Sequence, residues 1–202
     1  VIRPDGTGLR RLTSVGAQKE FAGSPKWSRD GTRIIYYETT ADGAYHAQSG
    51  TPVRGETQLI SIDVKSLVRT GHTTGDGTKL WPQWLPDGAI GSLEKFPNGD
   101  AELQIRRGSA VVAKSPRAQV RNPSWSSDGK QVAYYKILPD PAGTGLIPEF
   151  SRDPAFALTV ATSWFQAFSP DGSKLAVAAS GGGRVEVMNP DGSERRLVFN
   201  QQ

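Results

Sequence analysis

Apolar and polar residues alternate along this chain in short runs, without the three-to-four-residue rhythm of an amphipathic helix. The clearest runs each follow an Asp-Gly pair: TRIIYYE, AIGSLEK, KQVAYYK and SKLAVAAS. A period of two, with β-branched and aromatic residues in the apolar positions, is typical of β-strands. The 23 glycines and 14 prolines supply many turns between them. The pattern predicts an all-β fold of short strands joined by tight turns.

The Asp-Gly pairs belong to a repeat in which an aromatic residue ends one strand and the turn leads into the next. Glycine supplies the positive φ that such a turn needs. The four copies contain Trp27, Asp30 and Gly31; Trp84, Asp87 and Gly88; Trp125, Asp128 and Gly129; and Phe168, Asp171 and Gly172. Their aromatic residues are 57, 41 and 43 positions apart. Two of these intervals match the roughly 40–45 residues of a four-stranded propeller blade, and the third fits a blade with an insertion.

A second hairpin signature alternates with the first, at residues 1–13, 58–70, 102–115 and 185–199. Together the two hairpins predict four-stranded antiparallel blades whose aromatic residues pack between neighbouring blades. The whole chain, residues 1–202, then reads as a β-propeller segment, with a half blade at 1–14 and blades at 24–70, 81–115, 122–161 and 164–200. We expect the blade at 122–161 to be irregular, because four prolines interrupt its second half.

The repeat resembles the WD40-like repeats of TolB-type β-propellers, in which a Trp-Ser-Pro-Asp-Gly hairpin alternates with an Asp-Gly hairpin that ends in Leu-Thr. Ser169-Pro170-Asp171-Gly172 and Leu12-Thr13 carry the likeness. The resemblance implies a ring of six or more blades, so about four blades and a half would be part of a larger ring. The rival is a closed four-bladed ring with a spare hairpin. The resemblance also implies a periplasmic or otherwise extracytoplasmic protein with cell-envelope proteins among its partners.

Composition narrows the function classes. The net charge is +4, but the basic residues are scattered, which argues against a nucleic-acid groove. The chain has no cysteine, which excludes disulfides and thiolate chemistry. No apolar run reaches the roughly 18 residues of a membrane span, so a membrane-spanning chain is not expected. Neither a Gly-x-Ser-x-Gly elbow nor an EF-hand pattern occurs, so we expect neither an enzyme nor a cofactor.

Long connections over a rigid scaffold are the usual place for binding, and propeller geometry puts them on the face opposite the Asp-Gly turns. We expect them at residues 39–57, 71–80, 116–122 and 138–154. The candidate binding residues on this face are Tyr45, His46, Arg54, His72, Lys79, Arg117, Glu149, Arg152 and Asp153. The two histidines with Asp42 or Glu149 are a conceivable metal site, but no motif fixes their spacing, and ordinary surface histidines are the better interpretation.

Three functions remain open at this point. The leading hypothesis is a non-enzymatic scaffold that binds a protein or peptide on the long-loop face or across the central channel. The second is an accessory or gating propeller of a larger hydrolase, such as a serine peptidase or amidohydrolase, whose catalytic domain lies outside this chain. A propeller lyase or glycan-active enzyme is the third, and having only two histidines counts against it.

Overall fold

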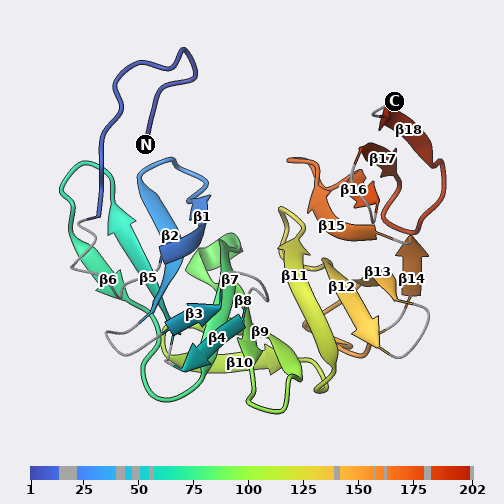
Figure 1. Ribbon diagram of the computed structural model, residues 1–202, viewed down its shortest axis with the longest axis horizontal. Coiled ribbons are helices and arrows are strands. Elements are labelled where there is room, and N and C mark those ends of the chain that lie inside the picture. Colours follow the sequence, from blue (N-terminus) through green and yellow to red (C-terminus); the bar gives the residue numbers. More distant parts are fainter. Residues whose placement is uncertain are drawn as a thin grey trace. The chain divides into compact units, whose positions relative to one another are not determined.

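The protein is described by a computed structural model that covers residues 1–13, 22–39, 44–46, 51–54, 57–138, 142–156, 158–161, 163–179 and 183–200 (Figure 1). The chain forms two compact units, residues 1–82 and 83–202. In both units the strands follow one another as antiparallel meanders, which confirms the all-β expectation.

The first unit contains one four-stranded meander in the order β1-β2-β5-β6. Its strands are β1 (Ala22–Trp27), β2 (Arg33–Thr39), β5 (Thr57–Asp63) and β6 (Arg69–Gly71). A separate hairpin, β3 (Ala44–His46) with β4 (Thr51–Arg54), lies in the connection between β2 and β5. The alternating residues Ile34, Tyr36 and Ile62 form a small apolar core on one face of this meander, and Leu12 packs against it.

The segment Val1–Thr13 contains no strand, although the sequence predicts a hairpin there. Its two arms are nevertheless held together at their ends. The amide of Arg10 donates to the carbonyl of Val1 at 2.8 Å, and the terminal amine of Val1 donates to the carbonyl of Arg10 at 2.7 Å. The half blade at residues 1–14 therefore stays a prediction.

Three more meanders follow, and β7 (Thr78–Trp84) leads into the second unit. The first continues through the turn η1 (Pro86–Gly88) to β8 (Ile90–Lys95), β9 (Ala101–Arg107) and β10 (Ala110–Lys114). The next consists of β11 (Gln119–Trp125), β12 (Val132–Leu138), β13 (Gly143–Ile147) and β14 (Leu158–Ala161). The last consists of β15 (Ser163–Phe168), β16 (Leu175–Ala179), β17 (Arg184–Met188) and β18 (Arg196–Asn200).

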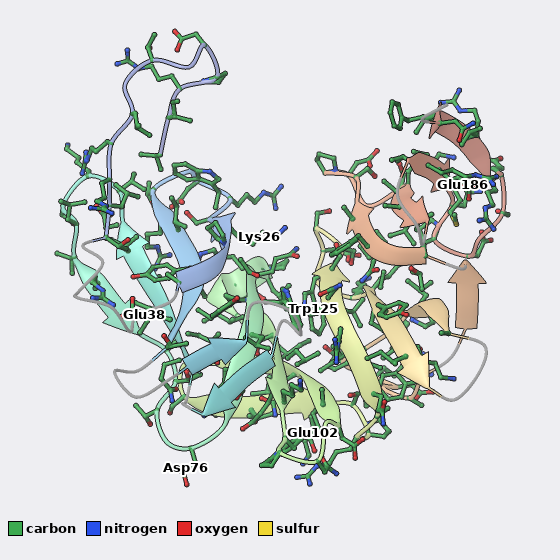
Figure 2. The ribbon with its side chains drawn as sticks, viewed as in Figure 1. Lys26, Glu38, Asp76, Glu102, Trp125 and Glu186 are labelled. Carbon is green, nitrogen blue, oxygen red and sulfur yellow. The ribbon has the colours of Figure 1, made fainter. Side chains whose placement is uncertain are left out.

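The meanders of the second unit pack face against face. Trp125 on β11 is 1% exposed, meets Phe150 edge-on with ring centroids 4.8 Å apart, and lies directly over Gly91 on β8. Figure 2 marks the position of Trp125. An aromatic ring can lie this close to a neighbouring strand only where that strand has no side chain.

An apolar cluster joins the next two meanders. It contains Ala133 and Leu146 from one and Leu175, Val177 and Met188 from the other, with Phe168 packed against it. Phe168 and Trp125 thus have the packing role that the repeat predicts. Trp27 differs, since it is 54% exposed among the described residues.

Three of the four repeat turns share one set of hydrogen bonds. In the turn after Trp27, the hydroxyl of Ser28 donates to Asp30 Oδ1 at 2.6 Å and accepts the amide of Arg33 at 2.9 Å. The same pair of bonds recurs around Ser126 and around Ser169. A short polar side chain that bonds its own backbone in this way favours a turn over a continued strand.

The remaining turn, after Trp84, has Leu85 in place of the serine and cannot form this pair of bonds. Asp87 instead adopts a φ of 62° and Gly88 follows at 71°, so the chain reverses through two consecutive left-handed residues. The Asp87 side chain is 75% exposed. The turn that lacks the serine hydroxyl thus has a different conformation from the other three.

The first strands of three meanders have an unusual backbone three residues before the aromatic residue. Ser24, Trp81 and Asn122 have φ values of 52°, 50° and 50°, and each is followed by proline. In β1 and β11 this residue coincides with a shift in register against the second strand. The left-handed residue is the inserted residue of a β-bulge, which bends the strand locally.

The two ends of each meander differ. The repeat turns and the connections between third and fourth strands form the short-turn end. Connections between second and third strands, and the links from one meander to the next, form the long-loop end. In the second unit the long-loop end includes residues 96–100 between β8 and β9 and residues 115–118 between β10 and β11.

Substitution of Gly91 by Ala is expected to lower the free energy of unfolding by about 1–3 kcal/mol, because the new methyl group overlaps the buried indole of Trp125. Gly71→Ala is the matched control, since Gly71 also lies in a strand but its added methyl group meets only Ile60, at 4.0 Å. Urea unfolding followed by tryptophan fluorescence measures both. Equal midpoints for the two variants would contradict the packing described here.

The stability of the protein in acid is expected to depend on the aspartates of the repeat turns. Hydrogen bonds from the serine hydroxyls of their turns are the main cause that lowers the pKa of Asp30 and of Asp171 to about 2. The side-chain and backbone bonds of Thr32 add to the effect at Asp30, and those of Ser173 add to it at Asp171.

A carboxylate with a lowered pKa stabilises the folded state above the unfolded pKa of about 4, and this contribution is lost as the pH falls toward 2. The melting temperature should therefore fall between pH 4 and pH 2, and it should fall less steeply in the double variant Asp30→Asn, Asp171→Asn. An unchanged slope in that variant would show that other carboxylates control acid unfolding.

Candidate functional site

Three of the predicted binding residues lie in the inserted hairpin of the first unit. Tyr45 and His46 belong to β3 and Arg54 belongs to β4. The side chains of these three residues, and Asp42 as a whole, lie outside the described residues. Their proposed role stays a prediction.

His72 and Lys79 both take part in holding the long-loop end of the first unit together. The ring nitrogen Nε2 of His72 is 2.8 Å from the hydroxyl of Ser61, and burial lowers the pKa of His72, with a further contribution from the charge of Arg33. Lys79 is 3% exposed, and its ammonium group donates to the carbonyls of Gly75 at 3.0 Å and Asp76 at 2.5 Å. Both contacts are structural.

Glu149, Arg152 and Asp153 lie at the short-turn end, which corrects the expectation that they lie at the long-loop end. Strand β13 fills the middle of the stretch that the sequence predicts as one long connection, so these residues follow β13 at the opposite end of the meander. The amide of Phe150 donates to the carbonyl of Lys130 in the repeat turn at 2.8 Å. The glycines and prolines around β13 conceal it from a reading of alternation alone.

Arg117 is the predicted residue that lies beside a hollow at the long-loop end of the second unit. Its guanidinium carbon is 3.7 Å from the centre of the Phe96 ring, and its Nε donates to Glu102 Oε1 at 3.1 Å. Its side chain is 55% exposed. A cation placed over an aromatic face and paired with a carboxylate is held in position while its remaining donors stay accessible.

Glu102 is the buried centre of this arrangement, near the start of β9 (Figure 2). Its side chain is 8% exposed, and besides Arg117 it contacts the ammonium group of Lys114 at 3.7 Å and accepts Gln104 Nε2 at 3.2 Å. Glu94 is its direct partner across β8 and β9 and also accepts Gln104 Nε2, at 2.8 Å. Two carboxylates opposite each other repel, so the amide and the surrounding cations are needed to hold them.

The hollow itself has a volume of about 520 Å³. Charged and aromatic side chains form one part of its wall, and the outer strand β10 contributes an apolar part. The lining residues are Glu94, Phe96, Glu102, Gln104, Val111, Val112, Ala113, Lys114 and Arg117. We refer to it below as the Arg117 hollow.

The polar residues behind the hollow alternate along β9. Glu102, Gln104 and Arg106 share one face of the strand, whereas Leu103 and Ile105 occupy the other face. As whole residues, the three polar ones are 6%, 2% and 8% exposed. Arg106 donates to Gln104 Oε1 at 2.7 Å, while its Nε is buried with no hydrogen-bond partner in the described part of the chain. A buried row of polar groups is costly unless its members bond one another, and here most of them do.

Sequence reasoning missed Glu94, Phe96, Glu102 and Lys114 as members of this site. Each lies in or beside a strand and fits the alternation that predicts the strand, so nothing in the local pattern marks it. The available signal was the repetition of polar residues at every second position of β9, which Glu102, Gln104 and Arg106 carry, whereas the third strand of the next meander, β13, reads GTGLI.

Neither a cluster of metal-ligating side chains nor a membrane-spanning helix occurs in the part of the chain that the structure describes. The described residues contain no group of three or more histidine, cysteine or acidic side chains that could hold a metal ion. Nor does any helix within them have the length and apolar character needed to span a bilayer.

A larger hollow of about 900 Å³ lies in the first unit, between residues 1–13 and the face of the meander that carries Trp27, Ile34 and Tyr36. Its walls are mainly apolar. It lies on an apolar face of the meander that residues 1–13 cover only in part. The Arg117 hollow is the better candidate site, because its cations and carboxylates are held by specific contacts and could recognise a polar partner group.

Comparison with solved structures identifies the fold. The putative TolB of Agrobacterium tumefaciens is 18% identical with a TM-score of 0.65, over 90% of this chain and 63% of that chain. TolB of Acinetobacter baumannii is 17% identical with a TM-score of 0.59, over 100% of this chain and 59% of that chain. The β-propeller domain of the Trilobed protease from Pyrococcus furiosus is 13% identical with a TM-score of 0.57, over 91% and 59%.

These likenesses show that the chain has the fold of a TolB-type β-propeller, as the repeat predicts. The chain spans about three fifths of the length of each of these three structures. No protein-family model matches the sequence, and no curated protein matches it either.

Proposed function

We propose that this TolB-type propeller is a non-enzymatic scaffold that binds another protein or a peptide at its long-loop end, in the Arg117 hollow. The observation that carries the proposal is the exposed guanidinium of Arg117, which Phe96 and the buried Glu102 hold at the edge of a hollow of about 520 Å³. Fixed donors around an open, partly apolar hollow are what a protein-binding site requires.

The chemistry of the hollow favours binding over catalysis. Its carboxylates are paired with cations and amides, and its lining contains no serine, histidine or tyrosine that a neighbouring base could activate. The central channel is the other surface that a closed propeller offers to a partner. The defined geometry around Arg117 favours the long-loop end over the channel.

An extracytoplasmic location and partners from the cell envelope belong to the same proposal. The likeness to two TolB structures supports them. Fractionation of the native cells, followed by detection of the chain with a specific antibody, distinguishes this location from the cytoplasm.

Replacing Phe96 and Arg117 by alanine is expected to reduce recovery of bound partners at least about fivefold, because both the aromatic seat and its cation are lost. The purified protein is used as bait in cell-envelope extracts, and recovered proteins are quantified by mass spectrometry. Arg107→Ala is the matched control, since the Arg107 side chain is also 55% exposed but lies at the short-turn end beside Asp87. Partners that remain bound to the double variant as well as to the control would contradict the proposed site.

The second candidate function is an accessory or gating propeller of a larger hydrolase. The likeness to the propeller domain of the Trilobed protease favours it, because in that protein the same fold accompanies a protease. The coding sequence on either side of this chain distinguishes the two functions. A nucleophile elbow or a histidine-rich metal motif in the same reading frame would support the hydrolase, whereas further propeller repeats alone would count against it.

A further inference from the structure

We infer that the Arg117 hollow recognises a carboxylate on an acidic segment of the partner, which Lys114 and Arg117 hold from two sides while β10 receives the neighbouring apolar side chain. The inference rests on the proposed binding function and adds the chemistry of the partner to it.

The two cations are neighbours because one buried carboxylate attracts both. Glu102 Oε1 is 3.1 Å from Arg117 Nε and 3.7 Å from Lys114 Nζ. The side chains of Arg117 and Lys114 are nevertheless 55% and 61% exposed. Glu102 thus fixes a pair of accessible positive charges at the wall of the hollow.

Both cations retain donors after these contacts. Within the described part of the chain Arg117 donates through its Nε, which leaves the two terminal nitrogens of its guanidinium for a guest. The separation of 3.7 Å between Lys114 and Glu102 is too long for a hydrogen bond, so the ammonium group also has donors to offer. An incoming carboxylate has acceptor positions for both groups.

The carboxylates of the hollow, in contrast, are already engaged. Glu102 faces Arg117, Lys114 and Gln104, and Glu94 accepts from Gln104 at 2.8 Å and from Arg106 at 3.4 Å. Three cations therefore surround two carboxylates in this cluster. The excess of positive charge favours an acidic guest over a basic one.

The apolar wall extends the site beyond a single charge. Val111 and Val112 on β10 are 40% and 53% exposed, although both belong to a strand. In the described part of the chain β10 pairs with β9 on one side only, so it is the outer strand of its meander. A segment that alternates acidic and apolar residues would place carboxylates at Lys114 and Arg117 and apolar side chains against the valines.

The experiment uses three synthetic octapeptides in which valine alternates with glutamate, glutamine or lysine. Each carries a fluorophore, and binding to the full chain is measured by fluorescence anisotropy at low and at physiological salt. The glutamate peptide is expected to bind most tightly, and its affinity should fall as salt rises, because exposed charges are screened. Equal binding of the three peptides would overturn the inference and leave the proposed binding function standing.

Charge-removing variants then locate the binding. Lys114→Gln with Arg117→Gln should weaken the glutamate peptide about tenfold, since two exposed ion pairs are lost. The control double variant, Arg107→Gln with Lys130→Gln, removes the same net charge at the short-turn end and should leave the affinity unchanged. Equal losses in the two double variants would overturn the inference, because binding would then follow net charge alone.

A second pair of variants tests the apolar wall without altering the cluster. Val112→Glu should weaken the glutamate peptide about threefold and Val112→Lys should strengthen it by a similar factor, because Val112 is exposed beside the hollow. The lysine peptide should respond in the opposite direction. Identical affinities in both variants would place the peptide elsewhere on the protein and overturn the inference.

Discussion

The packing of one meander against the next is the interaction on which the rest of the second unit depends. Trp125 can lie flat on β8 only because Gly91 has no side chain there. An apolar cluster around Leu175 and Met188 does the same for the last meander. The sheet β11–β14 is used for packing on both of its faces, so its strand ends and outer strands remain for contact with other molecules.

This constraint explains why a site at the long-loop end has its foundation inside a sheet. Glu102 is buried in β9, but its carboxylate reaches the end of the strand and fixes Arg117 in the next link. The link supplies an exposed charge, and the sheet supplies its orientation. A loop residue alone would lose this orientation through side-chain motion, which is costly to restrain when a partner binds.

Local chemistry determines how much of the fold could be predicted from the sequence. The serine and aspartate of the repeat turns bond each other within five residues, so the turns and the strands beside them follow from the local pattern. Strand β13 could not be recognised in this way, because Gly143 and Gly145 remove the alternation, and the strand is defined by its pairing with β12 and β14. As a result the sequence pattern places Glu149 at the wrong end of its meander.

The candidate site depended still less on local pattern. Arg117 could be found because it lies in a long connection, whereas Glu94 and Phe96 contribute through contacts with residues that are distant in the sequence. Such contacts are set by the register of β8 and β9, which alternation does not specify. Trp27 shows that the repeat pattern has the same limit for burial. Its position in the repeat does not determine how much of its side chain other residues cover.

The left-handed residues that precede proline in β1 and β11 have a consequence for solubility. Each of these strands is the first of its meander and has one side without a partner strand in the described part of the chain. Proline lacks an amide hydrogen, and a bulge interrupts the regular spacing of the backbone groups, so another extended chain cannot add to this side in continuous register. Pro25 and Pro123 therefore hinder the pairing of these edge strands with strands of other molecules. Such pairing leads to aggregation in proteins that consist of many short strands.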